Sequence, residues 1–197
     1  MHGRRIFFVA QEGLPFLAIA LSTVVGAMHY LGPGYSLLPA LVFVFLLLLF
    51  RDPPRLVQSV ALGVVSPVDG QVVSVDKVDS GELETAVHRI VIRIDSLGTY
   101  TVRSPVEGKI KDPGSNALWL QTDEGDDVIL RFSGYRLGLA PRSFARIGER
   151  LGQGQRCAYL RLARLAEVQL PIAGKVLVTE GQTVVAGSDV IATVPHS

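Results

Sequence analysis

The sequence predicts a mainly β protein that is preceded by an N-terminal α-helical membrane hairpin. Two apolar stretches separated by Gly-Pro-Gly lie within the first fifty residues. Short runs of Val, Ile and Leu, broken by Gly, Pro and Asp, follow from residue 51 onward, and this pattern is typical of strands joined by tight turns. We therefore expect a membrane hairpin over 1–50 and a β domain over 51–197.

The two helices of the hairpin are expected at about 14–31 (LPFLAIALSTVVGAMHYL) and 35–50 (YSLLPALVFVFLLLLF). Both stretches are at the short end for crossing about 30 Å of hydrocarbon. A signal peptide does not explain them, because no small-residue cleavage site follows the first stretch and a second apolar stretch comes directly after the turn. A hairpin of two helices fits better.

The arginine distribution predicts the orientation of this hairpin. Arg4 and Arg5 precede the first helix, Arg51 and Arg55 follow the second, and the connecting loop has neither Lys nor Arg. The positive-inside rule therefore places both termini and the β domain in the cytoplasm, at the cell (inner) membrane. The alternative is a hairpin that enters the bilayer without crossing it, because both stretches are short and Pro39 interrupts the second.

Net charge and cysteine content set further bounds on the chain. The formal net charge is +1, and the single cysteine, Cys157, excludes an intramolecular disulfide and favours a reducing compartment. Because Cys157 lies within RCAYLRL, an apolar run, we expect it to pack in a strand rather than to react.

Two sets of repeats occur within the β domain. SPVDGQV (66–72), SPVEGKI (104–110) and LPIAGKV (170–176) share a Pro, a Gly and branched apolar residues at the same spacing. GERLGQG (148–154) and GQTVVAG (181–187) each place two glycines six residues apart, as turns with positive φ require. The repeats predict pseudo-symmetric strands, as in the barrel-sandwich hybrid domains of lipoyl and biotinyl carriers. A carrier function is excluded, because no lysine lies in the Met-Lys-Met or Asp-Lys-Ala hairpin that such carriers modify.

Several motifs in chain order resemble the short-form phosphatidylserine decarboxylases. After the hairpin come FRDPPR (50–55), VVSPVDGQVVSV (64–75), RSPVEGKI (103–110) and LPIAGKVLVTEGQTVVAGSDVIA (170–192), so the resemblance covers nearly the whole chain. It implies a membrane-attached protein with an all-β soluble part. It also implies a pyruvoyl cofactor, which the family makes from an internal Ser that follows a Gly, and which acts as an electron sink during decarboxylation.

The residues of this chain depart from the family pattern at the processing site. Ala163 and Arg164 stand where the family carries Gly-Ser, and Tyr100 stands where it carries the His of an Asp-His-Ser set; only the Asp persists, as Asp69. A guanidinium has no nucleophilic oxygen, and a Tyr is a weak base at neutral pH. We therefore expect no pyruvoyl cofactor at Ala163 and Arg164, and no metal.

Asp69 is matched to the family by position, yet an Asp before a Gly in a tight corner is also an ordinary turn residue. Without its family partners, we interpret Asp69 as structural rather than catalytic. The Gly-Ser pairs at 114–115 and 187–188 are better explained as turns, away from the family position. His88 precedes the strand IVIRI and is offset from the family site, so it is a poor replacement base.

Positive charge gathers on one segment, 131–165, which carries eight arginines against the single acid Glu149. On a domain tethered to the cytoplasmic leaflet, such a segment would meet anionic head groups. The lipid-binding candidates are Arg136, Arg142, Arg146 and Arg150. The alternative is that these arginines lie on solvated strand faces. Nucleic acid is not an expected partner, because no aromatic residues interleave with the basic ones.

The sequence therefore predicts a membrane-anchored, catalytically inactive relative of phosphatidylserine decarboxylase. It would act by binding anionic membrane phospholipid or by docking to an integral membrane protein complex. The alternative is an active, pyruvoyl-dependent phosphatidylserine decarboxylase of phosphatidylethanolamine biosynthesis, matured at a Gly-Ser bond away from the family position.

Overall fold

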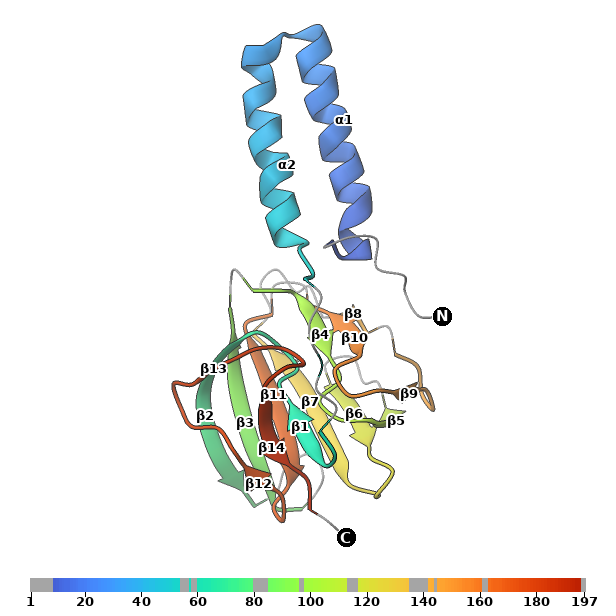
Figure 1. Ribbon diagram of the computed structural model, residues 1–197, viewed down its shortest axis with the longest axis vertical. Helices are drawn as coiled ribbons and strands as arrows, with labels where there is room; N and C mark the ends of the chain where they lie inside the picture. The colour runs from blue at the N-terminus through green and yellow to red at the C-terminus, as the bar shows by residue number, and fades with distance from the viewer. Residues whose placement is uncertain are drawn as a thin grey trace. The chain divides into compact units, whose positions relative to one another are not determined.

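The computed structural model divides into two compact units, residues 1–54 and 55–197 (Figure 1). It describes residues 9–53, 57, 60–79, 85–95, 98–112, 117–134, 142–143, 145–160 and 163–195. The first unit is helical and the second is built of strands. The predicted order of two N-terminal helices followed by a mainly β part is confirmed.

Two α-helices form the first unit: α1 (Leu14–Tyr30) and α2 (Leu37–Leu49). A short 3₁₀ helix precedes each of them, η1 (Gln11–Gly13) before α1 and η2 (Pro33–Ser36) before α2. Helix α2 therefore begins two residues later than the expected 35. The sequence suggested that Pro39 would interrupt the second helix. Pro39 instead lies in the first turn of α2, where backbone N–H groups have no partner within the helix, so the helix continues beyond it.

Phe50 packs at the end of the helix pair where α1 begins and α2 ends. Its ring stacks on Phe16 with centroids 5.6 Å apart, and its carbonyl accepts a hydrogen bond from the Ala10 backbone N at 2.8 Å. A Cβ at Gly13 would lie 2.3 Å from Phe50 Cγ, so this close approach requires a residue without a side chain. The chain thus enters α1 and leaves α2 at the same end of the pair.

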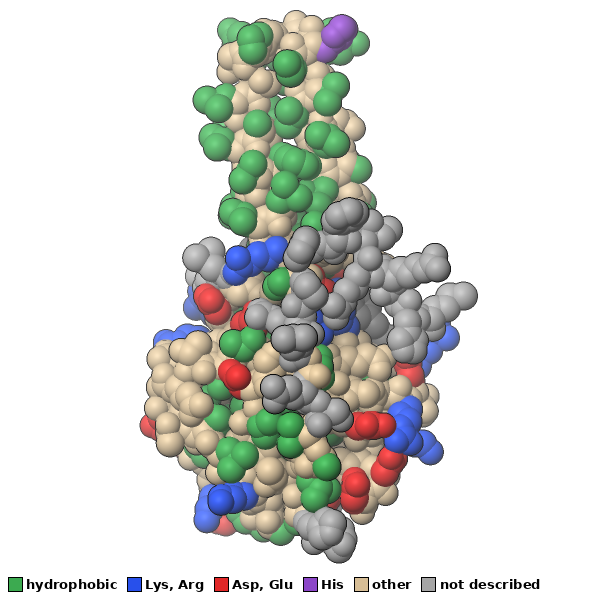
Figure 2. Space-filling model, in the orientation of Figure 1, with side chains coloured by type: hydrophobic (Ala, Val, Ile, Leu, Met, Phe, Trp, Pro, Cys, Tyr) green, Lys and Arg blue, Asp and Glu red, His purple; other side chains and the backbone are tan. Residues whose placement is uncertain are grey.

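The surface of the helix pair is apolar. No Asp, Glu, Lys or Arg occurs from residue 14 to residue 50, and Figure 2 shows hydrophobic side chains along the helices. The segment Gln11–Tyr30, with mean hydropathy 1.4, is long and apolar enough to cross a membrane, whereas Pro33–Leu49 is shorter. By length and composition, one helix in the described part of the chain is therefore suited to cross a membrane.

The described residues of the second unit form fourteen strands, all paired antiparallel within three sheets (Figure 1). They are β1 (Gly63–Val65), β2 (Gly70–Val78), β3 (Val87–Ile94), β4 (Thr101–Arg103), β5 (Gly108–Asp112), β6 (Ala117–Gln121), β7 (Asp127–Ser133), β8 (Arg142–Ser143), β9 (Arg150–Leu151), β10 (Arg156–Tyr159), β11 (Leu165–Pro171), β12 (Lys175–Val176), β13 (Thr183–Val184) and β14 (Val190–Thr193). The largest sheet has the order β13-β2-β3-β11-β7-β6-β5-β9. The smaller sheets are β1-β14-β12 and β4-β10-β8.

The core of this unit lies on one face of the large sheet. Ile90 and Ile92 of β3, Val168 and Leu170 of β11 and Leu130 of β7 are fully buried. Their spacing of two along each strand is the alternation that the sequence shows, because successive strand residues point to opposite faces.

The first two copies of the Pro-x-x-Gly repeat form equivalent corners. The Ser66 hydroxyl donates to the Val68 carbonyl and the Ser104 hydroxyl to the Val106 carbonyl, each at 2.7 Å. The corners also bind each other, since the Val65 backbone N donates to the Pro105 carbonyl at 2.8 Å. The third copy, 170–176, instead joins β11 to β12.

The glycine turns at 148–154 and 181–187 pack on these corners in matching ways. Gly181 N donates to the Val72 carbonyl and Gly148 N to the Ile110 carbonyl, both at 2.8 Å. Strand β13 then pairs with the start of β2 as β9 pairs with the start of β5. The internal pseudo-symmetry predicted from the repeats is present in the hydrogen bonds.

Candidate functional site

Asp69 occupies the first corner, directly before β2, with 9% of its surface exposed. One carboxylate oxygen accepts hydrogen bonds from the Thr99 backbone N at 3.2 Å and the Thr99 hydroxyl at 3.0 Å. The other accepts from the Ala186 backbone N at 2.9 Å. This side chain therefore joins three segments that are far apart in the sequence.

Asp69 and Arg164 both accept backbone hydrogen bonds from the end of β3. The Asp95 backbone N donates to the Asp69 carbonyl at 3.0 Å, and the Ile94 backbone N donates to the Arg164 carbonyl at 2.8 Å. Asp69 precedes β2 and Arg164 precedes β11, and these strands pair with β3 on its two sides. Because neighbouring strands lie about 4.8 Å apart, the two backbones are roughly 10 Å from each other.

Tyr100 follows Thr99, the residue that binds the Asp69 carboxylate. Its carbonyl accepts a hydrogen bond from the Leu160 backbone N at 2.7 Å, and its half-buried ring packs against the core. Burial raises the pKa of the Tyr100 phenol, and the charge of Asp95 raises it further. The phenol therefore stays protonated at neutral pH, which makes it a poor general base.

Ala163 is buried in the core, whereas the Arg164 side chain is exposed. The Arg164 backbone N donates to the Ser133 carbonyl at 3.2 Å, so both its backbone groups are held by neighbouring strands. Its guanidinium makes no hydrogen bond or ion pair with a described residue. With no hydroxyl at 163 or 164, this position does not fit a pyruvoyl group made from the chain.

The Gly-Ser pair at 187–188 lies closer to Asp69 than the sequence suggested. It follows Ala186, the residue that binds the Asp69 carboxylate, and the Gly187 backbone N donates to the Ser66 carbonyl at 2.8 Å. A tight turn holds the pair, with the Val185 backbone N donating to Asp189 Oδ2 at 2.8 Å. The pair at 114–115 lies outside the described residues.

His88 does not join this group of residues. It pairs with Lys77 and Leu170 near the start of β3, six residues before Ile94. Six strand residues span about 20 Å, so the imidazole is not placed to serve Asp69 or Arg164.

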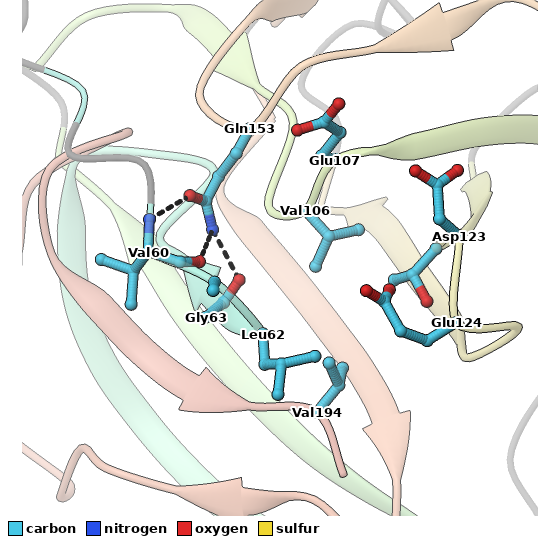
Figure 3. A pocket seen from close by; sticks show the side chains of 11 residues that line it. Val60, Leu62, Gly63, Val106, Glu107, Asp123, Glu124, Gln153 and Val194 are labelled. Carbon is cyan, nitrogen blue, oxygen red and sulfur yellow. Dashed lines mark hydrogen bonds between the residues drawn. The ribbon is translucent and has the colours of Figure 1, made fainter. Parts of the chain in front are cut away.

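A pocket of about 500 Å³ lies at the second corner, the pseudo-symmetric counterpart of the Asp69 corner (Figure 3). Glu107 takes the place of Asp69 in the repeat, and Figure 3 shows it near Asp123 and Glu124 on one side of the pocket. Val106 contributes an apolar wall. No three His, Cys, Asp or Glu side chains in the described part of the chain are grouped to hold a metal ion.

The opposite side of the pocket is held by Gln153, at the repeat position of Ala186. Its amide Nε2 donates to the Gly63 carbonyl at 2.6 Å, and its Oε1 accepts from the Val60 backbone N at 2.9 Å (Figure 3). At the second corner, the side chain of Gln153 from the glycine turn makes these hydrogen bonds. At the first corner, the Asp69 side chain of the corner itself binds the backbone of the glycine turn. The two corners share a backbone but differ in polar contacts.

The four arginines expected to bind lipid are in different situations. The Arg150 guanidinium forms ion pairs with Glu107 at 2.9 Å and with Asp123, and the hydrogen bond to Glu107 is the main cause of its raised pKa. Its charge is therefore compensated within the molecule. Arg146 is exposed, Arg142 lies on β8 with its side chain outside the described part, and Arg136 lies outside the described residues altogether.

Cys157 is fully buried in β10, and its thiol donates to the Val102 carbonyl at 3.7 Å. Burial raises the pKa of this thiol to about 12. A thiol that is buried and protonated is unreactive, in agreement with the packing role expected from the sequence.

Sequence reasoning missed Thr99 and Ala186 as the partners of Asp69. Thr99 carries no motif of its own. Ala186 had one signal, because the repeat places it in a turn equivalent to that of Gln153, and such a turn packs on the neighbouring corner. The sequence does not show which residue reaches across each corner.

Comparison with solved structures defines the class of fold first. The chain resembles the glucose permease IIA of Mycoplasma capricolum with a TM-score of 0.51, at 21% identity, over 66% of this chain and 94% of that chain. At this identity the likeness concerns the fold alone. No protein-family model matches the chain.

Comparison with curated sequences then shows the family. The chain is 33% identical to the phosphatidylserine decarboxylase proenzyme of Nitrosomonas europaea, over 93% of this chain and 94% of that protein. It is 31% identical to the proenzymes of Aromatoleum aromaticum and Burkholderia mallei, over 95% of this chain and 96% of each. The chain belongs to the phosphatidylserine decarboxylase proenzyme family.

Proposed function

We propose that the chain is a membrane-anchored member of this family that has lost self-processing and acts by binding anionic phospholipid. One observation carries the proposal: Arg164, preceded by Ala163, stands directly before β11, where the family resemblance places Gly-Ser. A pyruvoyl group is formed from a serine, and a guanidinium cannot supply the attacking oxygen.

The contacts of Asp69 support a structural role for this residue. One carboxylate oxygen accepts hydrogen bonds from Thr99 and the other accepts one from Ala186, and the side chain is nearly buried. Tyr100, at the family His position, is a weak base, because burial raises the pKa of its phenol above its already high ordinary value. These hydrogen bonds and the protonated phenol support a stabilising role for the corner over a role in acid–base chemistry.

The apolar helix pair supports attachment to the membrane. In this proposal α1 and α2 form a hairpin in the cell membrane, both termini face the cytoplasm, and the β unit, a barrel-sandwich-hybrid-like domain, lies at the anionic leaflet. The excess of arginine over 131–165 gives this segment, though not the unit as a whole, the charge that such a surface attracts, at roughly 1 kcal/mol per Arg near the lipid.

Intact-mass measurement of the purified full chain tests the loss of processing. We expect one species near 21.2 kDa that does not react with carbonyl reagents and releases no carbon dioxide from phosphatidylserine. A fragment that begins with a pyruvoyl group would contradict the proposal, whichever serine it came from.

The second candidate function is an active decarboxylase that matures at the Gly-Ser pair 187–188. The observation in its favour is the hydrogen bond from Ala186 to Asp69, which places this pair beside the family Asp. Against it stands the tight turn at 185–189, which already uses the backbone groups of Val185 and Ser188. Docking to an integral membrane protein complex is a further alternative, separated from the first by whether the purified chain selects lipid or a protein.

A further inference from the structure

A four-residue turn at 146–149 presents an isoleucine at its tip. The Glu149 backbone N donates to the Arg146 carbonyl at 3.0 Å, and the Arg146 backbone N donates to Glu149 Oε2, also at 3.0 Å. Gly148 has a φ of 79°, which a residue with a side chain rarely adopts. These bonds fix the turn, so that Ile147 and Arg146 project from a defined backbone.

The pseudo-symmetric turn at 179–182 has the same backbone. The Gln182 backbone N donates to the Thr179 carbonyl at 3.2 Å, and the Thr179 backbone N donates to Gln182 Oε1, also at 3.2 Å. Gly181 has a φ of 83°. Glu180 therefore occupies the position of Ile147, and Thr179 that of Arg146.

The two turns differ in chemistry although their backbones match. Ile147 is 71% exposed, although an isoleucine gains by removal from water, and its counterpart Glu180 is charged and well solvated. The Arg146 guanidinium makes no hydrogen bond or ion pair with a described residue. The Glu149 carboxylate, by contrast, is held on the Arg146 backbone. The turn 146–149 thus offers an apolar tip beside a guanidinium that is not paired with any described side chain.

We infer that this turn is a membrane-contact element, in which Ile147 enters the interfacial region of an anionic leaflet while Arg146 binds a lipid phosphate. The inference rests on the proposed function and names the residues that would carry it. An apolar side chain next to a basic one is the combination that binds at the boundary of head groups and acyl chains. A bilayer is the partner that the chain itself supplies, because its first unit carries a helix apolar and long enough to cross one.

The pseudo-symmetric turn supplies a matched control for the experiment. We would introduce cysteine at 147 or at 180 in the full chain, attach an environment-sensitive NBD fluorophore, and reconstitute each protein in nanodiscs. The discs contain either phosphatidylcholine alone or phosphatidylcholine with phosphatidylglycerol. The wild-type chain should take up no label, since its single cysteine is buried with a thiol pKa of about 12.

In anionic discs, the label at 147 should shift its emission to shorter wavelength and be quenched by lipids that carry a spin label on the acyl chain. The label at 180 should do neither. Arg146→Gln should reduce the shift at 147 without changing the emission at 180. In neutral discs the label at 147 should behave as in water.

Equal spectra at 147 and 180 in anionic discs would overturn the inference. A shift at 147 that is as large in neutral discs would also overturn it, because Arg146 would then have no part in the contact. These outcomes are distinguishable from failure of the proposed function, which is measured separately by anionic-lipid titration and intact mass. A chain that binds anionic lipid while its 147 label stays in water loses only this inference.

Discussion

Thr99 binds one carboxylate oxygen of Asp69 twice, through its backbone N at 3.2 Å and its hydroxyl at 3.0 Å. The Asp69 side chain therefore holds the segment between β3 and β4, which contains Thr99 and Tyr100. This contact, together with that to Ala186, supports our proposal that Asp69 stabilises the fold, whereas the family resemblance alone suggests a catalytic carboxylate.

Removal of the Asp69 carboxylate should destabilise the β unit. Asp69→Ala leaves the backbone N groups of Thr99 and Ala186 without acceptors in a buried corner, at a cost of about 3 kcal/mol. Urea unfolding of the full chain in neutral detergent measures the loss. The matched control is Glu107→Ala at the equivalent position, where the side chain is 53% exposed and we expect a change below about 1 kcal/mol. Similar losses in both variants would contradict the structural role of Asp69.

Restoration of the family residues should require more than the serine. Ala163→Gly with Arg164→Ser supplies the Gly-Ser bond, but the protonated Tyr100 phenol leaves the site without a base. We expect this double variant to remain whole, and the triple variant with Tyr100→His to show chain cleavage, followed by denaturing gel and carbonyl reagent. Cleavage of the double variant at the same rate as the triple would show that no base is needed at position 100.

Charge reversal at Arg142 and Arg146 should weaken the binding of anionic lipid. Removal of two arginines that contribute about 1 kcal/mol each predicts a loss of roughly 30-fold, reversal adds repulsion to this loss, and added salt should weaken the wild-type interaction. The measurement is a titration of the full chain, in neutral detergent, with a short-chain phosphatidylglycerol. Lys175→Glu, at an exposed position on β12, is the control for net charge. An equal loss of lipid affinity in the control variant would show that net charge, and not these two arginines, determines the binding.

Labelling of the loop between the helices should reveal the topology. Gly34 is suited to a cysteine, because a Cβ there would meet nothing within 4 Å, whereas Gly32 has a φ of +92°. In intact cells, an impermeant maleimide should label Gly34→Cys from outside, or not at all if the loop stays within the bilayer. Lys175→Cys should react only after the membrane is opened. Labelling of Lys175→Cys in intact cells would refute a cytoplasmic β unit.

The Cys157 thiol should be inert in the folded chain at neutral pH. A pKa raised by three units, from 9.0 to about 12, lowers the thiolate fraction about 10³-fold, and burial blocks the reagent as well. This raised pKa means that protonation of the thiol stabilises the folded state below pH 9, and that this contribution falls as the pH rises towards 12. Alkylation followed by mass spectrometry should therefore be fast in denaturant and slow in buffer at pH 8.

The sequence predicted the helix pair and the pseudo-symmetric corners because both depend on local chemistry. Apolar runs, glycine spacing and the Ser-Pro start of each corner are readable without tertiary information, and Ser66 and Ser104 do form the same bond. The partners of Asp69 were not predicted, because Thr99 and Ala186 lie 30 and 117 positions away, Thr99 belongs to no motif, and the repeat that contains Ala186 does not show which residue it contacts. The pocket at Glu107 was missed for the same reason, since its walls come from five separate segments of the chain.

The place of β11 in the large sheet bears on how the chain would tolerate a break. This strand pairs along most of its length with β3 on one side and β7 on the other. A cut between Ala163 and Arg164 would therefore leave the C-terminal segment hydrogen-bonded on both edges, with β14 additionally paired to β1. Residues 1–163 and 164–197, produced as separate polypeptides in one cell, should assemble into a single particle that survives purification.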